Sequence, residues 1–175
     1  IKNRINDKIL FFNILVLYII MEKKIIWITG ASSGIGRALA IKFATEGWLV
    51  AASARRENLL KELNQENENI HSFPLDVTNT DQCKDIFNSI IQKLEGVEIS
   101  IFCTGIHDPQ SEKKFNLEKI KQIMEVNYFG TMNSINAVYE YFTKKKSGQI
   151  SIVSSVAGYR GLPAAGAYCA SKSAL

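Results

Sequence analysis

The chain has 175 residues, of which 46% are hydrophobic and 22% are charged, and its formal net charge is +4. This length predicts one domain, and the composition is that of a globular protein rather than a disordered chain or a disulfide scaffold. The charge is modest and gives no argument for nucleic acid binding, which usually needs a clustered basic face.

The first twenty residues differ in character from the rest. Residues 9–20 form an apolar run that is too short for a membrane-spanning helix, which needs about 20 residues. Basic residues precede this run, as in a signal peptide, but no small-residue cleavage site follows. Met21 opens a polar start that leads directly into a strand. We therefore expect residues 1–20 to be upstream sequence, with a membrane anchor or signal as the alternative, and residues 21–175 to be the N-terminal part of one catalytic domain.

From Lys24 onward, short apolar runs alternate with helical patterns. Strands are predicted at Lys24 to Thr29, Leu49 to Ala54, His71 to Leu75, Ile99 to Cys103 and Gln149 to Val153. Helices are predicted at Ile35 to Glu46, Glu57 to Asn64, Cys83 to Leu94 and Asn116 to Phe142, the third opened by a capping box of Thr78 and Asp81. Repeated β-α-β units predict an α/β fold with a Rossmann-like doubly wound parallel sheet in three αβα layers.

The turn after the first predicted strand reads TGASSGIG and leads into a predicted helix. This is the structural context that a dinucleotide-binding fingerprint needs, whereas an ordinary β-α connection is the alternative. Gly30 permits the tight turn, Gly34 lets backbone approach a pyrophosphate at the helix N-terminus, and Gly36 allows close packing of the helix. The hydroxyls of Ser32 and Ser33 can donate to phosphate oxygens.

The spacing G-x-x-x-G-x-G, with its flanks, resembles the short-chain dehydrogenase/reductase family. The resemblance makes this turn, including Ile35, part of a nicotinamide cofactor site. The family selects NAD with an acidic residue at the end of the second strand, where this chain has Ala54 and Arg55. Because an arginine forms charge-assisted bonds with a 2′-phosphate that a carboxylate would repel, the resemblance implies NADP(H) rather than NAD(H). A solvated loop is the alternative for Arg55 and Arg56.

Three further segments extend the resemblance. Asp76 and Val77 are similar to the family's adenine-contacting pair, although Asp76 alone has the alternative of a turn residue. Asn127 is similar to its mid-helix catalytic asparagine, with a neutral surface residue as the alternative. The fourth strand departs from the family's N-N-A-G, since residues 102–105 read FCTG. Gly105 still permits close approach of the cofactor, but the two asparagines that brace the sheet and the cofactor pocket are missing.

The last motif is Y-x-x-x-K. Tyr168 and Lys172 are four residues apart and share one face of a helix. A tyrosine hydroxyl is a poor base at neutral pH, and a neighbouring ammonium favours its phenolate form. The resemblance makes Tyr168 the acid/base and lets Lys172 also hold the cofactor ribose. It places Ser155 on the substrate oxygen and gives Asn127 a water that links Lys172 to solvent.

The resemblance therefore implies an oxidoreductase that interconverts a small-molecule carbonyl and a secondary alcohol by hydride transfer. Two alternatives are a non-catalytic NADP-binding sensor or scaffold and a relative of the sugar-nucleotide epimerases and dehydratases. The retained set of Asn127, Ser155, Tyr168 and Lys172 argues against the first, and the glycine spacing argues against the second. Family members continue past the Tyr168 helix, so we expect a fold that is incomplete at the C-terminus and a fragment that is inactive alone.

Partners and location follow from the same reasoning. The family commonly forms homodimers or homotetramers, and no nucleic acid or membrane partner is expected. The thiols of Cys83, Cys103 and Cys169 form no C-x-x-C pair and leave an odd number, which indicates a reducing, cytoplasmic setting and no zinc site. His71 and His107 fit no triad or ligand set. For His107 we predict a surface loop, with the border of the pocket as the alternative.

Overall fold

The computed structural model describes residues 24–109 and 114–175, so the prediction for residues 1–20 lies outside its described part. Within these residues one parallel sheet has the strand order β3-β2-β1-β4-β5. The strands are β1 Ile25–Thr29, β2 Leu49–Ser53, β3 Ile70–Ser72, β4 Ile99–Phe102 and β5 Gln149–Ile152. The predicted doubly wound parallel sheet is thereby confirmed.

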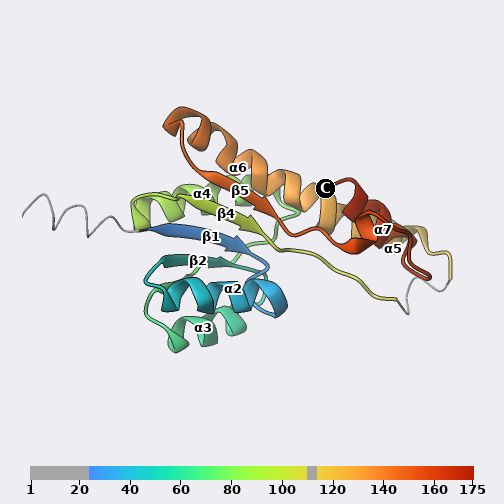
Figure 1. Cartoon of the computed structure of the whole chain (residues 1–175), viewed down its shortest axis with the longest axis horizontal. Helices are drawn as coiled ribbons and strands as arrows, with labels where there is room; N and C mark the ends of the chain where they lie inside the picture. Colours follow the sequence, from blue (N-terminus) through green and yellow to red (C-terminus); the bar gives the residue numbers. More distant parts are fainter. Residues whose placement is uncertain (1–23, 110–113) are drawn as a thin grey trace, which may run out of the picture.

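Helices cover both faces of the sheet (Figure 1). One face carries α2 Gly34–Thr45 and α3 Glu57–Glu66, and the other carries α4 Thr80–Leu94 and α6 Gly130–Lys145. The shorter helices α5 Leu117–Met124 and α7 Gly166–Ser173 lie together beyond the carboxyl ends of the strands. This arrangement gives the three predicted layers. The carboxyl ends of β1, β2 and β4 lie along the same edge of the sheet.

The central strand β1 explains why two cores form. All five of its side chains are buried, and they alternate between the faces of the sheet. Ile26 and Ile28 belong to the core under α2 and α3, whereas Trp27 belongs to the core under α4 and α6. The Trp27 ring meets Phe87 at 5.5 Å between centroids, and its indole N–H donates to the Ser53 hydroxyl at 2.9 Å. The indole is therefore buried with its polar group satisfied.

The third strand differs from the predicted range of 71–75. Regular strand geometry covers only Ile70–Ser72, although the amides of Phe73 and Leu75 still donate to carbonyls at the end of β2, at 2.9 and 3.0 Å. Pro74 between them has no N–H to donate, which the sheet tolerates because β3 is an edge strand. The chain therefore follows β2 beyond the strand itself and carries Asp76 to the sheet edge.

The predicted capping box of Thr78 and Asp81 is wrong. The N-cap of α4 is Asn79, whose side chain accepts from the Gln82 amide at 2.9 Å. The Thr78 hydroxyl is engaged elsewhere, because it donates to a carboxylate oxygen of Asp76 at 2.9 Å. Asn and Thr both suit an N-cap, so the sequence alone did not decide between adjacent positions.

The single helix predicted from Asn116 to Phe142 is two helices joined by a π-helical turn. Asn116 is the N-cap of α5, and the turn η1 covers Glu125–Phe129 before α6 begins. A π turn adds a residue to the helix repeat and is frequent at functional sites. Asn127 lies inside this turn and is fully buried, which excludes the alternative of a surface residue.

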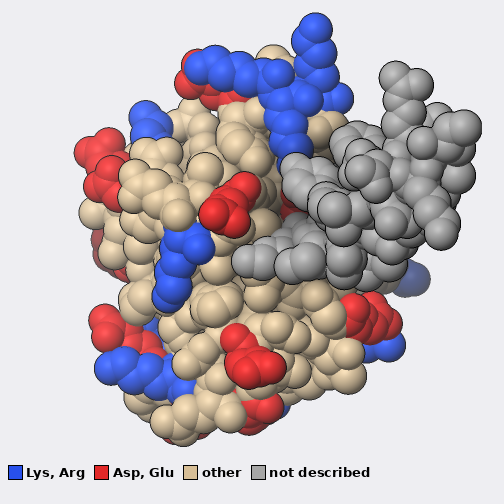
Figure 2. All heavy atoms as spheres, turned by 90° about the vertical axis from the view of Figure 1, so that its left-hand side faces the viewer, with Lys and Arg blue, Asp and Glu red and all other residues tan. Residues whose placement is uncertain are grey.

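No helix among the described residues is long and apolar enough to cross a membrane. Figure 2 shows several lysine and arginine side chains together at the top of the described part, and elsewhere on the visible face they are interspersed with aspartate and glutamate.

Candidate functional site

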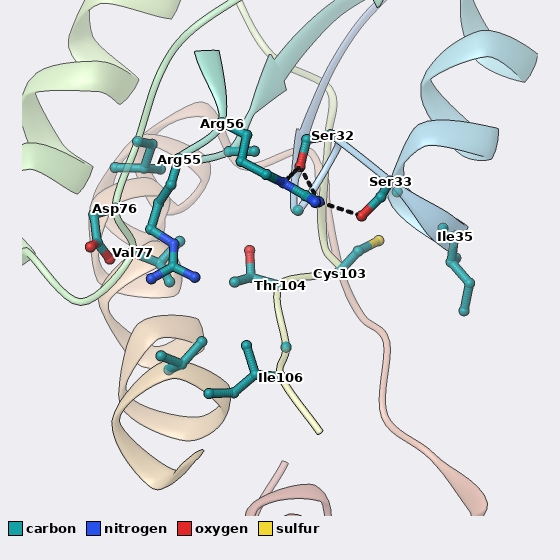
Figure 3. Close-up of a pocket in the computed structure, with 17 residues that line it drawn as sticks. Ser32, Ser33, Ile35, Arg55, Arg56, Asp76, Val77, Cys103, Thr104 and Ile106 are labelled. Atoms are coloured by element: carbon teal, nitrogen blue, oxygen red, sulfur yellow. Dashed lines mark hydrogen bonds between the residues drawn. The ribbon is translucent and has the colours of Figure 1, made fainter. Parts of the chain in front are cut away.

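A cavity of about 490 Å³ opens where the strand order reverses, at the carboxyl ends of β1, β2 and β4 (Figure 3). Ligands of open α/β sheets bind at this switch point. The predicted cofactor residues that line it are Gly30, Ser32, Ser33, Gly34, Ile35, Gly36, Arg55, Asp76, Val77 and Gly105. Tyr168 and Lys172, the other two predicted cofactor contacts, do not line this cavity.

The glycine turn is held by close backbone packing. Gly30 has a φ of +70°, and a Cβ atom there would lie 2.8 Å from the backbone nitrogen of Thr104. A Cβ atom on Gly36 would lie 2.8 Å from the carbonyl carbon of Gly30, so the helix packs on the turn itself. Gly34 has a φ of +55° and open space beside it. The turn thus has two crowded glycines and one that faces open space.

The start of α2 has the electrostatic character of an anion site. The side chain of Ser33, the N-cap of α2, makes no capping hydrogen bond, and the first turn of α2 contains no acidic residue. The first backbone N–H groups of a helix have no partner within the helix and carry a partial positive charge. The Arg56 guanidinium adds a full charge beside them, because its Nη2 donates to the hydroxyls of Ser32 at 2.9 Å and Ser33 at 2.6 Å. A phosphate group fits this end of the cavity.

The two arginines differ in position. Figure 3 shows the Arg55 side chain extended into the cavity between Asp76 and Thr104, while Arg56 reaches across to the serines. The Asp76 carboxylate accepts from the amide and hydroxyl of Thr78, so it closes a turn while lining the cavity. The bonds from Arg56 to the glycine turn were not predicted, and the position of Arg56 next to Arg55 was the available signal.

Asn127 connects the loop after β4 to α7. Its Oδ1 accepts from the Ile106 amide at 2.7 Å, and its Nδ2 donates to the Ile106 carbonyl at 3.0 Å. The same Nδ2 donates to the Ser171 hydroxyl at 3.0 Å. Both amide hydrogens of Asn127 are therefore used within the protein. The side chain fixes the backbone beside Gly105 relative to the helix that carries Tyr168.

Lys172 is buried, with 6% of its surface exposed, and its ammonium donates to the Val153 carbonyl at 2.9 Å. The ammonium also lies beside Gly105, where a Cβ atom would be 3.5 Å from Nζ. Burial lowers the pKa of Lys172, and the charge of a deprotonated Cys103 would oppose this shift. Burial also raises the pKa of Cys103 to about 11, so the thiol is protonated at neutral pH. Lys172 therefore lies at the edge of the cavity that Gly105 lines.

Tyr168 and Ser155 belong to neighbouring segments, since α7 packs against the short 3₁₀ helix that Ser155 opens. Tyr168 is half-buried on α7, one turn before Lys172. Ser155 is the N-cap of the short 3₁₀ helix η2 Val156–Gly158, and its Oγ accepts from the Ala157 amide at 3.2 Å. Within the described ranges no hydrogen bond joins the side chains of Tyr168, Ser155 and Lys172. The structure thus places the predicted residues in one region, but not as a bonded triad.

The structure places His107 in an exposed loop, as predicted, and adds a contact that was not predicted. Its side chain is exposed, as predicted for a surface loop, yet its ring packs on Tyr168 with 4.2 Å between centroids and 43° between planes. The available signal was its position two residues after Gly105, at the carboxyl end of β4. No group of three or more His, Cys, Asp or Glu side chains in residues 24–109 and 114–175 is placed to hold a metal ion.

Known proteins resemble this chain in sequence and in fold. The sequence model described as short chain dehydrogenase matches residues 24–175. The chain is 33% identical over 156 residues to 3-oxoacyl-[acyl-carrier-protein] reductase FabG of Thermotoga maritima, covering 87% of this chain and 63% of that protein. It is 31% identical over 159 residues to mouse dehydrogenase/reductase SDR family member 7, covering 86% of this chain and 47% of the relative.

A solved structure, ElxO with NADP bound, superposes with a TM-score of 0.78 at 26% identity. The match covers 87% of this chain and 63% of that one. The chain thus spans between about half and two thirds of the proteins that it resembles.

Proposed function

The chain belongs to the short-chain dehydrogenase family, and from this membership we propose that the full-length protein interconverts a carbonyl and a secondary alcohol with a nicotinamide cofactor. The observation that carries the proposal is the position of Lys172. Its buried ammonium lies beside Gly105, which lines the cavity of the glycine turn, and Tyr168 precedes it by one turn on α7. A dinucleotide in the cavity would therefore end close to a proton-transferring side chain.

We propose NADP(H) rather than NAD(H) as the cofactor. The helix start, the serine hydroxyls and Arg56 fit a pyrophosphate or phosphate group, and Arg55 extends into the same cavity. Residues 54–56 bring two guanidinium groups to the cavity, and the Arg55 side chain extends between the Asp76 carboxylate and Thr104 (Figure 3). Charge-assisted bonds from arginine favour a 2′-phosphate. The similarity to ElxO, whose structure has NADP bound, supports the same choice.

The cofactor, when bound, supplies the hydride, and the chain supplies proton transfer and orientation. In the direction of reduction the Tyr168 hydroxyl donates a proton to the carbonyl oxygen of the substrate. The Lys172 ammonium uses one N–H on Val153, which leaves two for the cofactor ribose and for charge stabilisation of Tyr168. The Ser155 hydroxyl oxygen accepts from a backbone amide, so its hydrogen is free to donate to the same substrate oxygen. The water predicted beside Asn127 stays a prediction.

The test is Tyr168→Phe in the full-length protein. NADPH oxidation is followed by absorbance with ethyl acetoacetate and other carbonyl compounds, and NADPH affinity by fluorescence. Loss of general acid catalysis is worth about 10²- to 10⁴-fold, so we expect kcat to fall at least 100-fold with unchanged NADPH affinity. Tyr139→Phe is the control, because Tyr139 is 63% exposed on α6. Turnover retained by Tyr168→Phe would contradict the proposal, and biological function retained without turnover would favour the sensor alternative.

Cofactor choice is tested by Arg55→Ala and Arg56→Ala. Loss of a hydrogen bond to a charged group is worth about 1.5–3 kcal/mol, so we expect the Kd for NADPH to rise at least about tenfold. For Arg55→Ala the Kd for NADH should stay within about twofold, because NADH has no 2′-phosphate. Arg37→Ala is the control, since Arg37 pairs with Glu66 on the surface of α2 and α3. Equal weakening of both cofactors by Arg55→Ala would refute NADP(H) selection by this residue.

We propose a small-molecule carbonyl or alcohol as substrate, consistent with the reductase name of the Thermotoga relative. For the full-length protein we propose a homodimer or homotetramer, which light scattering after size-exclusion chromatography tests. All three cysteines of the chain are free, and we propose the cytoplasm as their compartment.

A further inference from the structure

His107 is positioned by the bonds that fix its neighbour. Both the amide and the carbonyl of Ile106 are hydrogen-bonded to the Asn127 side chain, so the backbone that leads into His107 is held on its N-terminal side. From there the imidazole packs on the Tyr168 ring at 4.2 Å between centroids. At this separation two rings are in van der Waals contact, and such pairs restrict each other's rotation and tilt.

His107 also lines a recess beside the loop after β4. This recess has a volume of about 180 Å³ and lies between that loop and helix α5, and its lining residues are Ile106, His107, Asp108, Lys119, Gln122 and Ile123. The residues from α5 are spaced as one helix face, and the Lys119 ammonium donates to the Gln122 amide oxygen at 3.0 Å. Ile106 also lines the large cavity, so the recess and the cavity adjoin at this residue. His107 is thus shared by the Tyr168 contact and the recess.

We propose that His107 is a positioning and specificity-determining residue, which holds the Tyr168 ring and forms the wall between that ring and a recess for the substrate group beside the carbonyl. This inference rests on the proposed function. A ring face at position 107 limits the tilt of the phenol and thereby fixes the direction of proton donation. The same ring limits the size of the substituent that reaches the recess. A smaller side chain at position 107 would let the Tyr168 phenol tilt more freely and would admit a larger substituent to the recess.

The experiment compares His107→Ala and His107→Phe in the full-length protein, with ethyl acetoacetate as the small probe and ethyl benzoylacetate as the bulky one. An aromatic contact of this kind corresponds to about a two- to tenfold change, so we expect His107→Ala to lower kcat by that factor with the small probe. His107→Phe should restore kcat, because it keeps the ring face. His107→Ala should also raise the bulky-to-small ratio of kcat/KM at least threefold, with NADPH affinity unchanged. Lys121→Ala is the control, since Lys121 pairs with Glu118 on the solvent side of α5.

A substrate-free measurement tests the contact itself. With 3-fluorotyrosine incorporated, the ¹⁹F resonance of position 168 is identified by its loss in Tyr168→Phe. It should shift in His107→Ala and stay in place in Lys121→Ala. An unshifted resonance, an unchanged kcat and probe ratio, or failure of His107→Phe to restore kcat would each overturn the inference. Loss of turnover in Tyr168→Phe together with any of these results would leave the proposed function intact, whereas retained turnover in Tyr168→Phe would refute that function.

Discussion

Removal of the Asn127 side chain tests how the loop after β4 is held. Asn127→Ala deletes three hydrogen bonds, two to the backbone of Ile106 and one to the Ser171 hydroxyl. Each such bond contributes about 1 kcal/mol to stability. We therefore expect the free energy of unfolding to fall by about 3 kcal/mol, since Asn127 is fully buried and its partners gain no replacement. Urea unfolding of the full-length protein, followed by far-UV circular dichroism, measures this loss.

Hydrogen exchange separates this local effect from a general one. The Ile106 amide donates only to Asn127, so its exchange should become fast in Asn127→Ala while the amides of β1 keep their order of protection. Asn133→Ala is the matched control on α6, because Asn133 donates to Val77 rather than to the loop after β4. Slow exchange of Ile106 in Asn127→Ala would refute the reasoning. So would equally fast exchange of Ile106 in the control.

Three further predictions concern stability. Ser100 is buried in β4, and its hydroxyl has no hydrogen-bond partner in the described residues, so Ser100→Ala should keep or raise the free energy of unfolding. Ser134→Ala removes a hydrogen bond to a backbone carbonyl and should lower the free energy of unfolding by about 1 kcal/mol. Urea unfolding compares the two variants. Gly36→Ala should lower the melting temperature and weaken NADPH binding, because its Cβ overlaps the glycine turn, while Gly161→Ala meets open space and should change neither. Burial and, secondarily, a nearby lysine lower the pKa of His71 from 6.5. The unfolded chain therefore binds this proton first, stability falls as pH drops below about 6.5, and His71→Gln should reduce the difference in unfolding free energy between pH 7.5 and pH 5.

The sequence predicted the layered fold because its signals are local and repeated. The run at Ile25–Thr29 is apolar throughout, as a strand buried on both faces must be, and the glycine turn follows it directly. The same reasoning failed where two choices have similar local energy. Thr78 and Asn79 both suit an N-cap, and only the bond from Thr78 to Asp76 decides between them. The π turn at Glu125–Phe129 contains neither proline nor glycine, so no local signal interrupts the helical pattern and a single helix was predicted.

The candidate site was predictable in residue type but not in contact. Motif order indicated the residues that line the cavity, since fixed spacing along the chain puts them at one sheet edge. The ring contact between His107 and Tyr168 joins positions 61 residues apart, and no periodicity links such positions. The reach of Arg56 to the two serines depends likewise on the angle at which α3 begins. Side-chain direction across a long loop is set by tertiary packing, which the sequence pattern does not contain.

At the end of β4, where the family pattern has two asparagines, this chain has Phe102 and Cys103. Phe102 is buried and meets the Trp27 ring edge-on at 5.6 Å, and burial of such a side chain contributes about 1.5–3 kcal/mol. The Thr29 hydroxyl is buried without a partner in the described chain, which costs about 1–3 kcal/mol. The two terms are of similar size, so the burial of Phe102 offsets the cost of the unpartnered Thr29 hydroxyl. The cavity beside Gly30 keeps its shape through the backbone of Cys103, whose carbonyl carbon lies 2.9 Å from where a Cβ would stand. We therefore expect cofactor affinity to depend on the glycine turn and the arginines rather than on the side chain at position 103.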